Sequence, residues 1–200
     1  MNNPRLIAAA AAVLMLSACE KPAGPVNNAG SATTDATASG TLVASALPAL
    51  PTVPEPVFGP NFVDSAGTAN LFEIAEGRLA LKRSGNAAVK AFASMMIDAH
   101  TKSTTALQAA VAASGQTIDL PSALPDALQT KLAALTQTDA GSFDQAYMAD
   151  QLAAHEGALS ALQIYARRGD VAALKTFASD TVPTVEDHLA RAKALQASLK

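Results

Sequence analysis

The chain has 200 residues and a formal charge of −3, from 14 Lys and Arg against 17 Asp and Glu. This charge, without a basic stripe or an aromatic platform, argues against a nucleic-acid-binding protein. Half of the residues are apolar but only 4% are aromatic. Much of the apolar content is alanine, the strongest helix former, so the composition predicts an all-α domain.

Residues 1–18 are typical of a bacterial signal peptide. Arg5 forms a short positive region, and the apolar run from Leu6 to Ala18 is too short to span a bilayer comfortably. The run ends in Leu-Ser-Ala-Cys, which resembles the lipobox of bacterial lipoproteins. The resemblance implies cleavage before Cys19 and a lipid on its sulfur, which would anchor the protein to a membrane facing the periplasm. Glu20, in place of Asp, favours the outer membrane. The alternative is an ordinary signal peptide followed by a chance cysteine.

Residues 19–56 are predicted to form a flexible linker. They are rich in Pro, Gly, Ala, Ser and Thr and show neither helical nor strand periodicity. Such a segment cannot bury enough apolar surface to offset the entropy lost on ordering. An ordered extension that packs on the domain is the alternative. Cys19 is the only cysteine, so no intramolecular disulfide can form.

Residues 57–200 are predicted to contain four long helices, with boundaries set by glycine and by capping residues. Asn86 and Asp170 are expected to cap the second and fourth helices, and Ser142 begins a capping box for the third. Pro183 lies within the fourth helix and is expected to kink it. The helices are expected at Asn61 to Arg83, Asn86 to Ser114, Ser142 to Arg168, and Asp170 nearly to Lys200.

The connections between these helices predict their topology. The first and second helices, and the third and fourth, are joined by very short turns, so each pair forms an antiparallel hairpin. Between Gly115 and Gly141 lies a longer connection with a predicted short helix from Asp126 to Leu135. It is long enough to cross the length of a bundle, which predicts a ferritin-like four-helix bundle. An up-down bundle with the short helix lying across one end is the alternative.

Three stretches of this domain carry a family resemblance: "NFVDSAGTANLFEIAEGRLALKRSGNAAVKAFASMMIDAHTK", "FDQAYMADQLAAHEGAL" and "LKTFASDTVPTVEDHLARAKAL". They resemble domain-of-unknown-function family 4142, whose members are often labelled membrane proteins and are considered ferritin-like. The resemblance extends from Asn61 to Leu195 and implies no established reaction. In the family pattern the first two histidines usually follow an Asp. Here Ala99 precedes His100 and Ala154 precedes His155, so this chain lacks those carboxylates.

All three histidines of the chain fall on the apolar faces of predicted helices. His100 lies on the second helix, His155 on the third and His188 on the fourth, while one phase of the first helix turns Glu73 and Glu76 inward. Three imidazoles and a carboxylate in mid-bundle predict a site for one Zn, Cu, Fe or Mn ion. Its affinity is expected to fall below about pH 6, where free imidazoles become protonated. The alternative is that the histidines are hydrogen-bonded core residues. From turn counting, His188 is the least well aligned of the three.

Other chemistry finds little support in the sequence. A ferritin-type di-iron centre needs Glu-x-x-His pairs, but Ile97, Leu152 and Val185 precede the histidines by three positions. There is no serine elbow or phosphate-binding loop. Some other candidates are interpreted as structural, with Met95 and Met96 as core filling and Glu156, Glu186 and Asp187 as solvated charges.

Three functions remain open. The first is a metal-binding protein of the periplasm that acts in metal handling or envelope stress. The second is a non-catalytic envelope module that binds a protein or the cell wall, with structural histidines. The third, a di-iron oxidase or peroxidase, is disfavoured by the missing pairs, so the sequence leans towards a protein that is not an enzyme.

Overall fold

The computed structural model describes residues 57–199. The predicted signal peptide, the lipidation site at Cys19 and the predicted linker lie outside these residues. The described part of the chain is helical, which confirms the all-α prediction. Its helices are α1 (Gly59–Arg83), α2 (Ala87–Ser114), α3 (Asp126–Gln137), α4 (Ala140–Arg168) and α5 (Ala172–Ser198).

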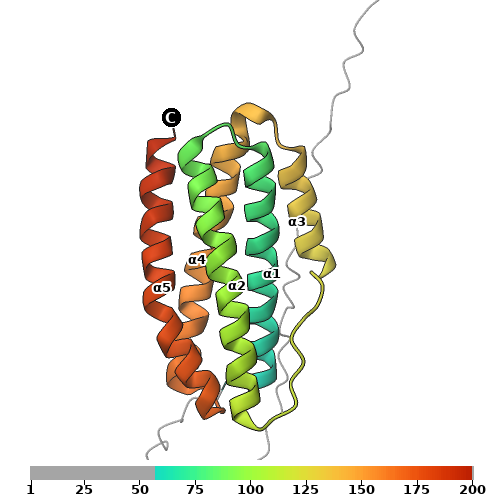
Figure 1. Cartoon of the computed structure of the whole chain (residues 1–200), viewed down its shortest axis with the longest axis vertical. Coiled ribbons are helices and arrows are strands. Elements are labelled where there is room, and N and C mark those ends of the chain that lie inside the picture. The colour runs from blue at the N-terminus through green and yellow to red at the C-terminus, as the bar shows by residue number, and fades with distance from the viewer. Residues whose placement is uncertain (1–56, 200) are drawn as a thin grey trace, which may run out of the picture. The chain divides into compact units, whose positions relative to one another are not determined.

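The four long helices form a bundle of two antiparallel hairpins, α1 with α2 and α4 with α5 (Figure 1). α2 and α4 run in the same direction, because the chain between them travels the length of the bundle before α4 begins. α2 also packs on α5, and α1 on α4, which closes the bundle. The predicted ferritin-like crossover is therefore confirmed.

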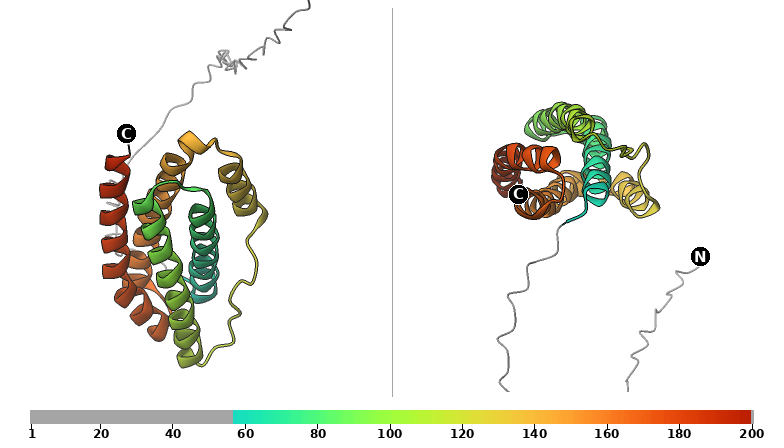
Figure 2. Two further views of the ribbon diagram at one scale, coloured as in Figure 1. Left: turned by 45° about the horizontal axis from the view of Figure 1, so that its top comes forward. Right: turned by 90° about the horizontal axis from the view of Figure 1, so that it is seen from below.

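The crossover lies along the side of the bundle. Figure 2 shows α3 outside the four long helices, and it packs on α1 and α4. Gly67 on α1 allows the crossover to approach closely, since a Cβ at this position would lie 2.6 Å from the ring of Pro121. The alternative was an up-down bundle with the short helix lying across one end. It is wrong, because the short helix lies along the side of the bundle, where it packs on α1 and α4.

The ends of α2 follow the predicted signals. The side chain of Asn86 accepts hydrogen bonds from the backbone N–H groups of Ala88 at 2.8 Å and Val89 at 3.3 Å. The helix ends at Gly115, whose φ of 69° is a left-handed conformation that glycine adopts without a steric penalty.

The starts of α4 and α5 differ from the prediction. α4 begins at Ala140, so Ser142 lies inside its first turn and does not cap it. α5 begins at Ala172, and the carboxylate of Asp170 instead accepts a hydrogen bond from the Tyr165 hydroxyl at 3.0 Å. A side-chain hydrogen bond across the turn between α4 and α5 has thus replaced the predicted cap of α5. Pro183 lies within α5 without ending it, and α5 changes direction along its length (Figure 1).

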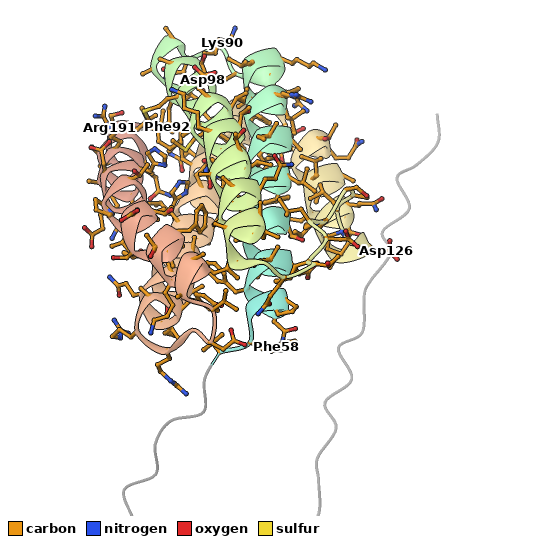
Figure 3. All side chains as sticks on the ribbon, turned by 60° about the horizontal axis from the view of Figure 1, so that its bottom comes forward. Phe58, Lys90, Phe92, Asp98, Asp126 and Arg191 are labelled. Carbon is orange, nitrogen blue, oxygen red and sulfur yellow. The ribbon has the colours of Figure 1, made fainter. Side chains whose placement is uncertain are left out.

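The apolar core consists of two clusters, one in each half of the bundle. The first lies towards the end marked by Phe58 and the second towards the end marked by Lys90 (Figure 3). The buried side chains of the first cluster include Phe62, Val63, Leu107, Val111, Leu162, Tyr165, Leu174, Phe177 and Val185. Those of the second include Ala80, Val89, Phe92, Met96, Phe143, Tyr147, Met148 and Ala192.

Candidate metal centre

A layer of polar side chains crosses the bundle between the two apolar clusters. Along α5, for example, Val185 belongs to the first cluster, His188 to the layer and Ala192 to the second cluster. The other three long helices contribute in the same way. This polar layer consists of Asn70, Glu73 and Glu76 from α1, His100 from α2, Gln151 and His155 from α4, and His188 from α5. Because burying polar groups is costly, the layer marks the candidate site.

The three histidines predicted as ligands converge in this layer, and we call them the His triad. The ring centroids of His155 and His188 are 5.5 Å apart, and the centroid of His100 lies 5.8 Å and 6.1 Å from these two. One ring nitrogen from each histidine lies within 4.8 Å of the other two. A tetrahedral ion with metal–nitrogen distances of about 2.0–2.1 Å requires nitrogens about 3.4 Å apart. The nitrogens of the triad, all within 4.8 Å of one another, are therefore close enough to converge on one ion with small side-chain adjustments.

Hydrogen bonds orient two of the three rings. His100 Nδ1 lies 2.8 Å from the side-chain oxygen of Asn70, whose nitrogen donates to the Ser103 hydroxyl at 3.2 Å. His155 Nδ1 lies 2.8 Å from the backbone carbonyl of Gln151. Because each partner is an acceptor, each Nδ1 carries the proton and donates, which leaves the lone pair on Nε2. Metal-binding histidines are usually oriented by such hydrogen bonds.

The nitrogens left over have no hydrogen-bond partner. They are the buried Nε2 atoms of His100 and His155 and the buried Nδ1 of His188. A buried polar atom without a partner costs about 1–3 kcal/mol. Three such atoms, one from each ring of the triad, form a donor set that a metal ion would satisfy.

Burial keeps the imidazoles of the triad neutral. It lowers the pKa of His100 to about 3 and the pKa of His188 to about 4, and neighbouring imidazoles add to the effect at both. Burial also lowers the pKa of His155. The charged form of each ring loses its hydration in the bundle interior, so the neutral form, which binds metals, is favoured. Protons therefore compete with a metal at a lower pH than the value of about 6 expected from unperturbed imidazoles.

Glu73 and Glu76 are buried in the layer, beside the triad. Glu73 Oε1 lies 3.7 Å from Nδ1 of His155, the nitrogen that already donates to a carbonyl. Glu76 accepts a hydrogen bond from the side chain of Gln151 at 3.0 Å. Within residues 57–199, the group of potential ligand atoms lying within 4.8 Å of one another contains the three histidines and neither carboxylate. The carboxyl pair is thus a neighbour of the triad.

The two carboxyl groups hold protons at neutral pH. Burial raises the pKa of Glu73 to about 8 and that of Glu76 to about 9, and the negative charge of Glu73 adds to the shift at Glu76. Glu73 Oε2, Glu76 Oε1 and the hydroxyl of Tyr147 are buried without hydrogen-bond partners.

Three residues of the site were not predicted from the sequence: Asn70, Gln151 and Tyr147. Asn70 lies three positions before Glu73 and Gln151 four positions before His155, spacings that put each pair on one helix face. This spacing was the signal from which Asn70 and Gln151 could have been predicted to share the face of the site residues. On α4 the buried face passes through Gln151, whereas Leu152 is only partly buried.

The residues interpreted as structural lie where expected. Met96 is fully buried in the second apolar cluster, and Met95 packs against this cluster. Glu156, Glu186 and Asp187 are exposed. None of these residues belongs to the polar layer.

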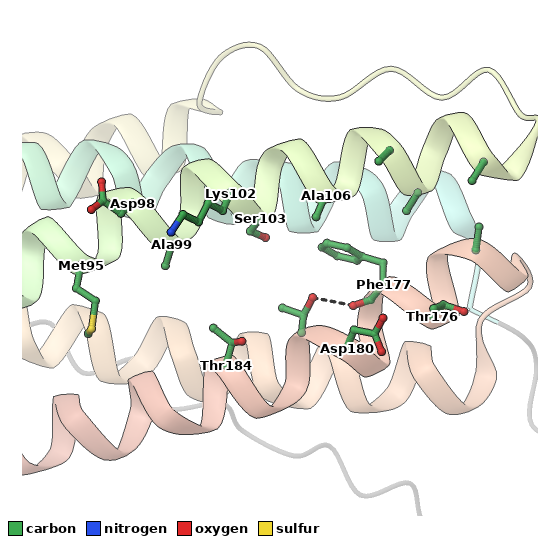
Figure 4. Close-up of a pocket in the computed structure, with 15 residues that line it drawn as sticks. Met95, Asp98, Ala99, Lys102, Ser103, Ala106, Thr176, Phe177, Asp180 and Thr184 are labelled. Carbon is green, nitrogen blue, oxygen red and sulfur yellow. Dashed lines mark hydrogen bonds between the residues drawn. The ribbon is translucent and has the colours of Figure 1, made fainter.

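Two cavities lie on opposite faces of the bundle. The larger, of about 980 Å³, is a groove between α2 and α5 with many alanines in its lining (Figure 4). The smaller, of about 540 Å³, lies between α1, α3 and α4, and its lining includes Glu73. Ala99 lines the groove and Ala154 lines the smaller cavity. An Asp at either position, as in the family pattern, would therefore border a cavity.

The fold and the site together define a class of protein: a four-helix bundle of ferritin-like topology with a histidine cluster in a buried polar layer. The family model for DUF4142, a domain of unknown function, matches residues 48–195. The chain belongs to this family.

Comparison with solved structures supports the fold. The crystal structure of a DUF305 fragment from Deinococcus radiodurans is similar to this chain, with a TM-score of 0.59 and 14% sequence identity. The match covers 70% of this chain and 95% of the fragment. At this identity the similarity concerns the fold alone. The search of curated proteins found no match. Among residues 57–199, no helix is both long and apolar enough to cross a membrane.

Proposed function

We propose that this protein binds one transition-metal ion through His100, His155 and His188. The observation that carries the proposal is the convergence of three imidazoles, each of which has one buried ring nitrogen without a hydrogen-bond partner. If the histidines were only core residues, each ring would be expected to use both nitrogens in hydrogen bonds. The hydrogen bonds to Asn70 and Gln151 instead direct the free lone pairs of two rings away from their partners.

The donor set favours a borderline transition metal. Imidazole nitrogen suits Zn, Cu and Fe, whereas Mg and Ca prefer oxygen ligands. Three protein ligands leave a fourth position for water or another small ligand. Zn²⁺ and Cu²⁺ are the first ions to test, followed by Fe²⁺ and Mn²⁺. We assign binding to this site and no reaction.

Metal analysis of protein purified without a histidine tag tests the proposal. We expect about one metal ion per chain, and we expect the melting temperature to rise when metal is added back to metal-free protein. A ligand that binds only the folded state stabilises it by RT ln(1 + [L]/Kd), about 2.7 kcal/mol at a hundredfold excess over Kd. If neither isolation nor titration with Zn, Cu, Mn and Fe shows binding, the histidines are structural. The function would then be that of an envelope module that binds a protein or the cell wall.

We further propose that the protein is a lipoprotein of the bacterial envelope, held by a lipid on Cys19 and facing the periplasm from the outer membrane. The signal peptide, the lipobox and Glu20 support this location. The full chain expressed in a Gram-negative host should fractionate with outer membranes, and its mass should include the lipid. Cys19→Ser should release the protein or leave an unprocessed precursor. A mature, unmodified N-terminus elsewhere in the chain would contradict the proposal.

A further inference from the structure

The smaller cavity borders the polar layer at Glu73. Its walls come from α1, α3 and α4, and Glu73 forms part of its lining. Glu73 is only 3% exposed, its Oε2 has no hydrogen-bond partner, and its Oε1 lies 3.7 Å from His155. This side chain therefore borders the cavity and also contacts a member of the His triad.

The charges around this cavity suit a cation. Asp64 contributes a carboxylate to the lining, and the hydroxyl groups of Ser65 and Thr68 lie in the same wall. The positive charge of Lys131 is matched by Asp150, at 3.1 Å. Such oxygen donors can coordinate a divalent ion transiently, and an ion that binds Glu73 displaces the proton that this carboxyl group holds at neutral pH.

The groove between α2 and α5 is larger, and its lining also contains oxygen donors, among them Asp98 and Asp180. Among the described residues that line it, none carries a buried polar atom without a hydrogen-bond partner. None of the three histidines lines either cavity, but Glu73, in the wall of the smaller one, contacts His155. Volume alone would favour the groove, but the buried and unpartnered carboxyl oxygen of Glu73 favours the smaller cavity.

We propose that a divalent metal ion reaches the His triad through the cavity between α1, α3 and α4, and that Glu73 is the transient ligand which passes it on to the triad. This proposal rests on the proposed function, since it needs a metal site at the triad. It adds a second binding position, with oxygen donors, on the path from solvent. Glu73 then determines how fast the site fills, whereas the imidazoles determine how tightly it holds the ion.

The rate of Zn²⁺ uptake by the metal-free, untagged full chain tests the proposal. Uptake is followed by stopped-flow mixing with a Zn²⁺-loaded chromophoric chelator, and the final stoichiometry is measured separately. Electrostatic focusing in a cleft raises association rates by about 10–10³-fold. Glu73→Gln has no carboxyl group that can release its proton and become an anionic ligand when the ion arrives. We therefore expect this variant to slow uptake by about tenfold or more, while the final stoichiometry stays near one ion per chain. An unchanged uptake rate would overturn the role of Glu73.

A second variant tests the path without touching the polar layer. Gly157 lines the cavity and has open space where a Cβ would be built, so Gly157→Lys adds a positive charge at the wall. We expect uptake to slow several-fold at low salt and to recover at high salt, because ions screen the added charge. Gly157→Ala is the control for the backbone change. Ala106→Lys, which adds the same charge to the groove between α2 and α5, is the control for the path.

The outcomes separate this proposal from the proposed function. Slow uptake in Gly157→Lys with normal uptake in Ala106→Lys supports entry through the cavity. The reverse result would mean that ions enter through the groove, which overturns the proposal and leaves the metal site intact. A wild-type chain that takes up no Zn²⁺, Cu²⁺, Mn²⁺ or Fe²⁺ would overturn both.

Discussion

His100→Ala is expected to lower the affinity for Zn²⁺ by at least about a hundredfold and to abolish the rise in melting temperature on metal addition. Structural zinc sites with four ligands contribute about 10–16 kcal/mol in total, so each ligand accounts for about 3 kcal/mol, or roughly a hundredfold in Kd. His155→Ala and His188→Ala should behave in the same way, because each histidine supplies one of the three converging nitrogens. Competition with a chelator of known affinity measures the change.

Two further variants make this prediction specific. Asn70→Ala removes the acceptor that orients His100 and should cost about 10–100-fold in affinity, the usual range for such supporting groups. Glu156→Ala changes an exposed charge next to His155 in sequence and should leave affinity unchanged. If Glu156→Ala weakened binding as much as the histidine variants do, the triad would not be the site.

The metal-free protein is expected to lose stability as the pH rises from 7 to 9. The folded-state pKa values of about 8 for Glu73 and about 9 for Glu76 lie above their ordinary value of 4.5. At pH values above 4.5 and below these raised pKa values, the folded state holds protons that the unfolded state has released. The free energy of unfolding then falls with rising pH, by up to about 1.4 kcal/mol per pH unit for each group. Urea denaturation at a series of pH values measures this slope.

The histidines produce the opposite slope at lower pH. Their folded-state pKa values, about 3 for His100 and about 4 for His188, lie below the ordinary value of 6.5. Between these limits the unfolded state binds more protons, so stability rises with pH. The two windows overlap between pH 4.5 and 6.5, where the opposite slopes offset each other. The loss of stability caused by the carboxyl pair should therefore stand alone only above pH 6.5, where the unfolded-state histidines release their protons.

Glu76→Gln identifies the source of the alkaline slope. The amide is uncharged and keeps an oxygen that can accept the hydrogen bond from Gln151. The variant should be more stable than the wild type at pH 8.5, with little difference at pH 5, whereas Glu156→Gln should match the wild type at both. An alkaline slope as steep as that of the wild type would show that the carboxyl pair is not its cause.

The fold was predictable because its signals are local. Asn86 and Gly115 define the turns around α2, and short connections leave no choice but antiparallel hairpins. The start of α5 was predicted less well, because the Asp170 side chain accepts a hydrogen bond from Tyr165 across the turn and therefore does not cap the helix. The crossover was predictable from the length of chain between α2 and α4.

The candidate site was predictable only in part. Helical periodicity places all three histidines inside the bundle, but turn counting suggested an axial offset for His188. In the structure its ring is 5.5 Å from that of His155, as close as any pair in the triad. Periodicity could not show that Glu73 faces the proton-bearing side of His155. Relative rotation of packed helices decides such details, and a single sequence carries no direct signal for it.

The polar layer has a consequence for the cooperativity of the bundle. The layer divides the apolar core into two clusters, one towards each end of the bundle. In the metal-free chain we therefore expect the two ends to open separately, as local unfolding units do. The triad draws on both hairpins, with His100 from the first and His155 and His188 from the second. A bound ion is therefore a crosslink between hairpins at the point where the core is interrupted. Hydrogen exchange would then slow at both ends of the bundle together, and the ion would convert two opening units into one.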